Sequence, residues 1–365
     1  QDEITVQVKD FSKAGIIKVK VVDQDTGAPL GGANVFVLDP LGETYNTYAD
    51  EQGIATIVCN PGVCKISAYK NDYKPKSMET EAIAGQTVTQ TIGLPRGQLV
   101  VGNLTVRRMT LEEIIDVGID VNAPENQYIY TYNVVLSFGD ISIEDNVMIN
   151  GAGKIVGDYR PIRIKDGDRE YIAHVAPISH PKHPEVRPTI AYMVLPGGAS
   201  WLKEFFEVEL ALENTADPEF ILDDSTAELK LPEGLELVPT NNTEKSLFVS
   251  LGSIAGGDKR NVKWIITSTK AGEYNLEAEF NGTLQPFGEP VKTVFRTSEP
   301  FRVWGTQALK MHIEADDWAI AGEEYYVKVG LENVSDIPVY NAKLLIAEGL
   351  NYRLRDDQPP YAEVK

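Results

Sequence analysis

Short runs of alternating apolar and polar residues recur along nearly the whole chain, and they constrain its fold more than any other feature. The longest run covers residues 128–138, where every second residue from Tyr128 to Phe138 is aromatic or aliphatic. Side chains of a β-strand point alternately to its two faces, so this period of two predicts half-buried strands. Gly, Pro, Asn and Asp separate the runs, as in turns. The sequence therefore predicts an all-β fold of tandem β-sandwich domains arranged as an elongated rod.

Helical periodicity is scarce in the sequence. Residues 109–115 predict one or two helical turns, because Thr110 can cap a helix and Glu113 follows three residues later. A helix this short does not change the fold class.

An internal repeat indicates the domain organisation. Residues 206–214 read Phe-Glu-Val-Glu-Leu-Ala-Leu-Glu-Asn, residues 325–333 read Tyr-Tyr-Val-Lys-Val-Gly-Leu-Glu-Asn, and an aspartate follows each three positions later. The match resumes at 227–235 and 342–350, which both end in Glu-Gly-Leu. This shared spacing distinguishes a repeat from the chance likeness of two strands.

The second copy of the repeat is shorter than the first. The first copy needs the strands of Trp264 and Tyr274 to complete its core, and these strands have no counterpart after residue 347. A half-sandwich would expose Tyr325, Val327, Val329, Leu331, Leu344 and Ile346. Soluble proteins seldom expose such a patch. We therefore expect that the native chain continues past Lys365, or that strands of another molecule complete this module.

The amino-terminal segment carries a series of turn residues at fixed spacing. They are Asp23, Thr26, Gly27, Pro29 and Gly32, then Thr47, Asp50 and Gly53, then Pro61, Gly62 and Tyr73. This pattern resembles the carboxypeptidase regulatory-like domain, which implies a seven-stranded prealbumin-like sandwich of secreted bacterial proteins. Cys64 and Asp72 depart from the family, which has Tyr and Gly there. The domain is an accessory of carboxypeptidases, and the sequence contains no His-x-x-Glu peptidase motif.

A sister family with the same sandwich, the CnaB-type pilin and adhesin modules, forms a Lys–Asn or Lys–Asp isopeptide bond. Val21 stands at the position of the reactive Lys, and Ser67, Ala68 and Tyr69 stand where the catalytic Glu would fall. We therefore expect no isopeptide bond here.

The first repeat copy also matches a known type of module. A Gly-rich turn at 251–257 precedes the Trp264 strand, and Gly272-x-Tyr274 follows it. This segment resembles the immunoglobulin-like CARDB modules of bacterial surface proteins, well over 200–300, in part over 306–365 and weakly over 97–199. We expect four domains: a carboxypeptidase regulatory-like sandwich (1–95), a weakly immunoglobulin-like domain (96–199), a CARDB-type sandwich (200–303) and an incomplete repeat (304–365).

Cys59 and Cys64 are the two cysteines of the chain, and Asn-Pro-Gly-Val separates them. A turn there would bring their β-carbons together, placing Cys59 opposite Cys64 and Ile57 opposite Ile66 across a hairpin. This favours a disulfide over two incidental thiols, and a disulfide indicates an oxidising compartment. The chain begins at Gln1 without a signal peptide, which fits a mature secreted chain or a piece of a longer one.

The charge of the chain limits its partners. It has 34 Lys+Arg and 54 Asp+Glu, a formal net charge of −20. Nucleic-acid binding needs a basic face, and anionic lipid repels an acidic protein. The sequence has no apolar run long enough to span a membrane. The expected partners are other protein chains or surface polysaccharide, including further copies in a homo-polymer, and not nucleic acid or the membrane interior.

Two further segments are candidates for strand exchange and for metal binding. Ile4, Val6 and Val8 alternate with polar residues and predict a strand ahead of the first sandwich. Such a strand can pair with its own sheet edge or complete the sandwich of a neighbouring subunit. His180 and His183 have the spacing of a zinc-binding pair, but the flanking prolines favour a solvated loop.

The remaining candidates are weak. The acidic pairs Asp223-Asp224, Asp316-Asp317 and Asp356-Asp357 could hold calcium, although solvated acidic turns are favoured over this. Acceptor sequences for N-glycosylation occur at Asn103, Asn241, Asn281 and Asn333. We predict no catalytic residue, no metal ligand and no cofactor apart from the calcium alternative.

Three functions are compatible with these features. We favour a non-catalytic, extracellular structural or adhesive protein whose sandwiches form a stalk or fibre on a bacterial cell surface. The alternatives are an accessory region of a larger secreted enzyme such as a hydrolase, and a filament subunit that assembles by strand exchange. An enzyme in its own right is the least favoured function.

Overall fold

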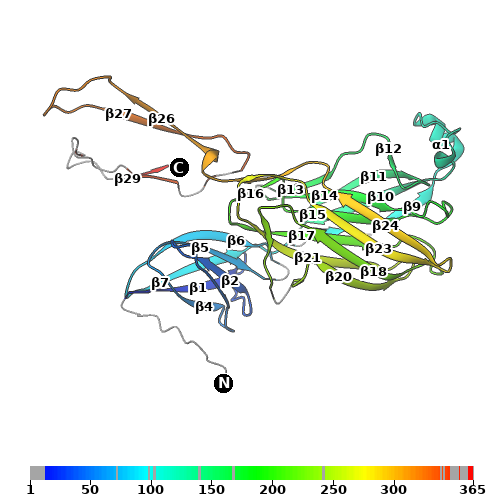
Figure 1. The fold of residues 1–365 in the computed structure, drawn as a ribbon, viewed down its shortest axis with the longest axis horizontal. Coiled ribbons are helices and arrows are strands. Elements are labelled where there is room, and N and C mark those ends of the chain that lie inside the picture. Colours follow the sequence, from blue (N-terminus) through cyan, green and yellow to red (C-terminus); the bar gives the residue numbers. More distant parts are fainter. Residues whose placement is uncertain are drawn as a thin grey trace. The chain divides into compact units, whose positions relative to one another are not determined.

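The computed structural model describes residues 13–70, 73–97, 99–101, 104–138, 141–166, 169–240, 243–337, 339, 342–345, 353 and 361–364. The chain divides into two compact units, Gln1–Val303 and Trp304–Lys365, each described here by itself. Strands dominate both units (Figure 1), which confirms the all-β prediction. The strand expected around Ile4, Val6 and Val8 lies outside the described residues.

The first unit begins with a seven-stranded sandwich. Its strands are β1 (Gly15–Asp23), β2 (Asn34–Leu38), β3 (Thr44–Tyr48), β4 (Ile54–Cys59), β5 (Gly62–Tyr69), β6 (Lys76–Ala82) and β7 (Thr87–Leu94). One sheet has the order β4-β1-β7 and the other β3-β2-β5-β6, and β1 runs parallel to β7. Alternate residues Ile17, Val19 and Val21 of β1 are fully buried between the sheets. This is the number of strands that the sequence resemblance implies.

The turn residues of the amino-terminal pattern close the loops of this sandwich. Buried Asp23 accepts hydrogen bonds from the backbone N–H of Thr26 (2.9 Å), the Tyr73 hydroxyl (2.9 Å) and Nε of Arg96 (2.7 Å). These bonds, the Thr26 N–H above all, hold the pKa of Asp23 well below its usual range. Gly53 has φ +75°, and a β-carbon there would lie 2.5 Å from the Val21 carbonyl oxygen. Only glycine fits that turn without strain.

Residues 96–303 form three stacked sheets, named here by a central strand of each. The β10 sheet contains β8 (Leu99–Val101), β9 (Thr105–Arg108), β10 (Ile129–Phe138), β11 (Ile141–Asn150) and β12 (Ile155–Val156). The β15 sheet has the order β13 (Ile162–Asp166), β14 (Arg169–Ile178), β15 (Thr189–Leu195), β17 (Phe205–Glu213), β21 (Lys259–Ser268) and β19 (Leu235–Leu237). The β18 sheet has the order β20 (Phe248–Ile254), β18 (Ile221–Lys230), β23 (Glu277–Gln285) and β24 (Glu289–Arg296). A small sheet joins β16 (Ala199–Trp201), β25 (Phe301–Trp304) and β22 (Gly272–Tyr274).

The β15 sheet overturns the expected boundary at 199/200. Strands β13 to β15 precede that boundary and β17, β19 and β21 follow it, yet β15 pairs with β17 from Ile190↔Glu213 to Val194↔Glu209. All seven residues of β15 are buried. Ile190 and Tyr192 pack toward the β10 sheet, whereas Ala191 and Met193 pack toward the β18 sheet. Residues 96–199 and 200–303 therefore share a central layer and are not two separate sandwiches.

The strands of the first copy belong to the β15 and β18 sheets, and their core lies between these two sheets. The alternate residues Phe206, Val208, Leu210 and Leu212 of β17 are buried there. Trp264 is fully buried, and its indole Nε1–H donates to the Ser246 carbonyl (2.9 Å). The predicted contribution of the Trp264 strand to this core is confirmed.

The carboxy-terminal unit contains two strand pairs and a 3-10 turn, η2 (Thr306–Ala308). β26 (Leu309–Ala315) pairs with β27 (Val327–Asn333), and β28 (Ala342–Leu345) pairs with β29 (Tyr361–Val364). One face of the β26–β27 hairpin is apolar apart from Asn333 at its end, with Met311 opposite Leu331 and Ile313 opposite Val329. Met311 and Ile313 are 55% and 63% exposed. Among the described residues of this unit the two strand pairs form separate two-stranded sheets. The side chains of Leu344 and Ile346 lie outside the described residues, and the incomplete repeat stays a prediction.

Candidate binding surface

A strap between β9 and β10 covers one end of the outer face of the β10 sheet. It includes α1 (Leu111–Asp116) and a 3-10 turn, η1 (Pro124–Gln127), and α1 lies at that end of the sheet in Figure 1. The predicted cap is confirmed, because the Thr110 hydroxyl accepts from the Glu113 N–H (3.3 Å) and the Thr110 N–H donates to Glu113 Oε2 (2.8 Å). Ile114 is buried with Ile129, and Met148 packs against this cluster. Apolar contacts thus fix the strap on the sheet.

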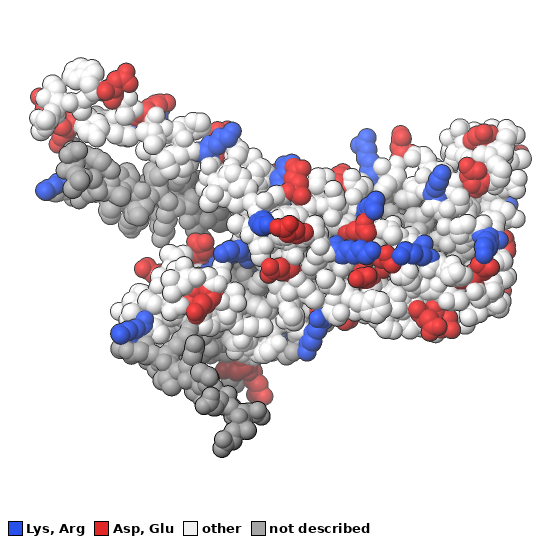
Figure 2. Space-filling model, in the orientation of Figure 1, with Lys and Arg blue, Asp and Glu red and all other residues white. Residues whose placement is uncertain are grey.

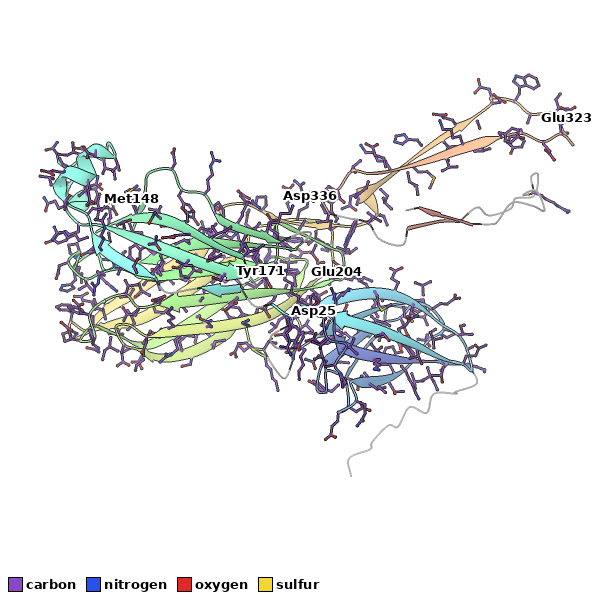
Figure 3. The ribbon with its side chains drawn as sticks, turned by 180° about the vertical axis from the view of Figure 1, so that it is seen from behind. Asp25, Met148, Tyr171, Glu204, Glu323 and Asp336 are labelled. Atoms are coloured by element: carbon purple, nitrogen blue, oxygen red, sulfur yellow. The ribbon has the colours of Figure 1, made fainter. Side chains whose placement is uncertain are left out.

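Beyond the strap, the same outer face carries a groove. Its volume is ≈ 470 Å³, and it is lined by Thr105, Val106, Arg107, Thr131, Asn133, Asn146 and Met148. A groove of this size is in the range of ligand sites in proteins. The view of Figure 3 labels Met148 at the strap end of the sheet.

The register of three strands places the groove residues in two rows. In one row, Asn133 of β10 lies opposite Thr105 of β9 and Asn146 of β11. In the next, Thr131 lies opposite Arg107 and Met148. Side chains of adjacent strands lie ~4.8 Å apart, so each row presents a short, regular series of groups.

The alternation of β10 explains why this face is polar. Tyr130, Tyr132 and Val134 point inward and are buried in the core between the β10 and β15 sheets. The Tyr132 hydroxyl donates to the Pro188 carbonyl (2.8 Å), which ties the loop of His180 to the sheet. The residues between them, Thr131 and Asn133, point outward.

The one charged residue that lines the groove is paired. The Arg107 guanidinium donates two hydrogen bonds to the Glu113 carboxylate, each 2.8 Å long. The Arg107 bonds, then the Thr110 N–H, lower the pKa of Glu113 to about 2, so the pair stays ionised at neutral pH. The groove therefore carries a guanidinium whose charge Glu113 balances.

Several polar groups of the groove have no protein partner among the described residues. Asn133 Nδ2 donates to Glu144 and, at 3.4 Å, to Asn146 Oδ1. This leaves Asn133 Oδ1, Asn146 Nδ2 and the hydroxyls of Thr105 and Thr131 without a hydrogen bond to the described part of the chain. They are two hydroxyls, one acceptor and one donor, all on residues that line the groove.

Charges elsewhere on the stack are interspersed. On the face shown in Figure 2, Lys and Arg lie among Asp and Glu rather than in one basic patch. Glu279 pairs with both Lys230 and Lys292 (2.7 Å each), and Arg296 pairs with Glu277 (2.7 Å). Ion pairs of this kind contribute little stability individually.

The two cysteines meet in a way that the sequence did not predict. Cys59 ends β4 and Cys64 lies in β5, but these strands belong to opposite sheets, so the expected hairpin register with Ile57 opposite Ile66 is wrong. Both cysteines are buried thiols, with Sγ atoms 3.7 Å apart across the core. Burial chiefly raises the pKa of Cys64 to about 12, so its thiol is a poor nucleophile. The disulfide stays a prediction, which intact mass before and after reduction tests.

The solvated loop predicted for His180 is wrong. His180 is only 4% exposed, and neither ring nitrogen has a partner among the described residues. His183 instead stacks on Phe287, with ring centroids 3.6 Å apart. Within the described ranges, no three His, Cys, Asp or Glu side chains gather as a metal site would require.

The acidic and glycosylation candidates are only partly described. Asp223 accepts from the Ser253 hydroxyl, and calcium binding stays a prediction. Asn281 is half-buried and donates to Glu279 (3.1 Å), whereas Asn333 is exposed. Asn103 and Asn241 lie outside the described residues.

Comparisons with known proteins add little about function. No family model matches the chain, and no curated protein matches it. The major pilin subunit BcpA of Bacillus cereus is 12% identical over 97% of this chain and 96% of its own, with a TM-score of 0.22. The major pilin SpaD of Corynebacterium diphtheriae is 12% identical over 79% and 66%, with a TM-score of 0.24. A DUF3823 family protein from Bacteroides ovatus is 9% identical over 80% and 98%, with a TM-score of 0.19.

These likenesses are too slight to assign a function to the chain. The carboxypeptidase regulatory-like and CARDB-type resemblances stay predictions. Among the described residues, no helix has the length and apolar character needed to cross a bilayer.

Proposed function

We propose that this chain is a non-catalytic, extracellular protein of a bacterial cell surface, where its β-sandwich modules form a structural or adhesive stalk or fibre. The shared β15 sheet is the observation that carries the proposal. Its strands β15 and β17 are hydrogen-bonded neighbours drawn from two modules, and β15 is buried on both faces. Bending one module against the other would break this ladder and open two cores at once, so residues 96–303 form a stiff element.

The titratable groups of the stack support a structural role. The imidazole of His174 accepts from the Ser298 N–H (3.2 Å) and is buried, as is His180. Burial lowers the pKa of each to about 4, so both are neutral and neither is poised as a base near pH 7. His174 Nδ1 also lies 3.1 Å from the Ser298 hydroxyl, so this imidazole ties the segment of Ser298 to β14, and both imidazoles serve packing.

The carboxy-terminal unit supports assembly with other β structure. The apolar face of β26 and β27 needs a cover, and other protein chains, including further copies in a homo-polymer, are the partners we propose for it. The segment with Ile4, Val6 and Val8 is the candidate strand for such exchange. Surface polysaccharide is the other proposed partner.

Immunogold electron microscopy of intact cells of the source organism tests the proposal. An antibody against the full chain should label the outside of the cell along fibres or a continuous layer. Label only in the medium, co-purifying with a hydrolase activity, would favour the accessory region of a secreted enzyme. Label confined to the cell interior would refute an extracellular role.

A further inference from the structure

The groove on the outer face of the β10 sheet has the chemistry of a site for an uncharged ligand. Its lining contains two threonines, two asparagines, a valine, a methionine and one arginine. No carboxylate is among the residues that line the groove, and Glu113 pairs with Arg107. The Glu144 carboxylate accepts from Asn133 at the edge of the groove, so an anionic ligand would meet a like charge there.

The open hydrogen-bonding groups are arranged for a repeating polar ligand. Donors and acceptors from three strands stand side by side, with Thr105, Asn133 and Asn146 in one row and Thr131 in the next. Strand pairing on both sides of β10 fixes their spacing. A pre-formed array of this kind loses little entropy when it binds.

An apolar element borders the same array. Met148 occupies the end of the second row, and the cluster of Ile114 and Ile129 holds it beside the strap. A methionine side chain adapts its shape to an irregular apolar surface. The groove thus offers polar groups on its floor and a soft apolar contact at one end.

We propose that this groove binds a neutral glycan chain. Sugar hydroxyls both donate and accept hydrogen bonds, which matches the threonine hydroxyls and the asparagine amides, and the C–H face of a sugar ring suits the Met148 contact. A peptide that binds by strand addition needs a free sheet edge, whereas this groove lies on a sheet face between paired strands. The site gives the adhesive form of the proposed function a ligand class, and rests on it to that extent.

Binding of the full chain to a broad array of neutral and acidic glycans, followed by titration calorimetry with the best neutral oligosaccharide, tests this site. We expect neutral glycans to bind and uronate-rich ones not to. Replacing Asn133 and Asn146 together by Ala should weaken binding by about tenfold or more, since two hydrogen bonds are lost.

A matched control lies on the same two strands outside the groove. The Ser137 and Ser142 hydroxyls bond each other (3.2 Å), and the double variant Ser137→Ala/Ser142→Ala should bind as wild type does. Circular dichroism checks that both double variants are folded. Absence of binding to every neutral glycan at millimolar concentration, or equal binding by the asparagine variant, would overturn the proposal. Surface labelling by immunogold in either of those cases would leave the structural role standing without this ligand.

Discussion

The two copies of the repeat pair their strands alike but differ in what covers them. In the first copy Met193 of β15 lies opposite Leu210 of β17, and in the second Ile313 of β26 lies opposite Val329 of β27. Met193 is 2% exposed and Ile313 63%. Pairing is therefore a property of the strand pattern itself, whereas burial depends on further strands.

The equivalence extends to the second pair of strands. Ala227 of β18 lies opposite Val249 of β20, and Ala342 of β28 lies opposite Val364 of β29, at matching positions of the repeat. In the first copy, β21 and β23 then join these pairs into full sheets. The second copy thus has the same strand pairing, although the described residues of β26 and β27 are largely exposed.

The asparagine at the end of the first repeat strand also differs between the copies in its burial and its bonds. Asn214 and Asn333 each accept a backbone N–H two residues later, at 3.2 and 3.0 Å. Asn214 also donates to the Ile254 carbonyl of β20 (3.0 Å) and is buried, while Asn333 is exposed. The local turn is common to both copies, and among the described residues the long-range bond is found for Asn214.

The largest expected difference between the copies comes from Trp264→Ala. Trp264 fills the core between the β15 and β18 sheets, so its loss should destabilise the first copy by about 3–5 kcal/mol. Urea unfolding followed by far-UV circular dichroism measures the change. Hydrogen exchange should rise across β17 to β24 and stay unchanged in β26 and β27. Equal loosening of both copies would mean that the second depends on the core of the first.

Acidification should lower the free energy of unfolding of residues 96–303, which contain the first copy, more than that of the second copy. His174 and His180 belong to the buried stack, and burial lowers the pKa of each from 6.5 to about 4. The unfolded chain therefore binds more protons between these values, and the free energy of unfolding falls as the pH drops from 6.5 to 4, by up to about 3 kcal/mol per imidazole. Urea unfolding at pH 7 and pH 4.5 measures it. His180→Leu should lose its share of this pH dependence, and an unchanged slope would contradict the buried neutral imidazole.

Alanine at the two equivalent asparagines sharpens the comparison further. Asn214→Ala would leave the Phe220 and Ile254 carbonyls without a donor in a buried site, at a cost of about 2–3 kcal/mol. Asn333→Ala lies on an exposed turn, where water replaces the lost bonds, and should cost less than about 1 kcal/mol. Urea midpoints of the two variants give both values. Equal costs would show that Asn333 is buried in solution by a covering partner.

Features set by neighbouring residues were predictable from the sequence. The Thr110–Glu113 cap, the buried Trp264 and the alternation of β17 all follow from patterns a few residues long. The dual role of β15 left a weaker signal, since residues 189–195 read Thr-Ile-Ala-Tyr-Met-Val-Leu and are apolar on both faces. Such a run marks a strand buried on both sides, but does not say which strand pairs with it.

Long-range geometry was beyond the sequence patterns. Cys59 and Cys64 seemed to face each other across a turn, but the chain crosses between sheets at that turn. The groove combines Thr105, Asn133 and Asn146, which are far apart in sequence and meet only through strand register. Alternation tells which face a residue occupies, and register tells which residues share a row.

The smallest expected effect belongs to the polar face of the second copy. Glu314 and Lys328 lie opposite each other on β26 and β27, with a 3.1 Å ion pair and side chains 72% and 77% exposed. A double-mutant cycle with Glu314→Gln and Lys328→Gln should give a coupling free energy of about 0.2–1 kcal/mol that shrinks in high salt, because water and ions screen the pair. In the first copy, Glu209 stands at the repeat position of Lys328 and pairs with Lys263 of β21, and both side chains are largely buried, where screening is weak. A salt-insensitive coupling above about 1 kcal/mol at Lys328 would mean that other β structure covers this face too, and the contrast between the copies would then be one of partners rather than of exposure.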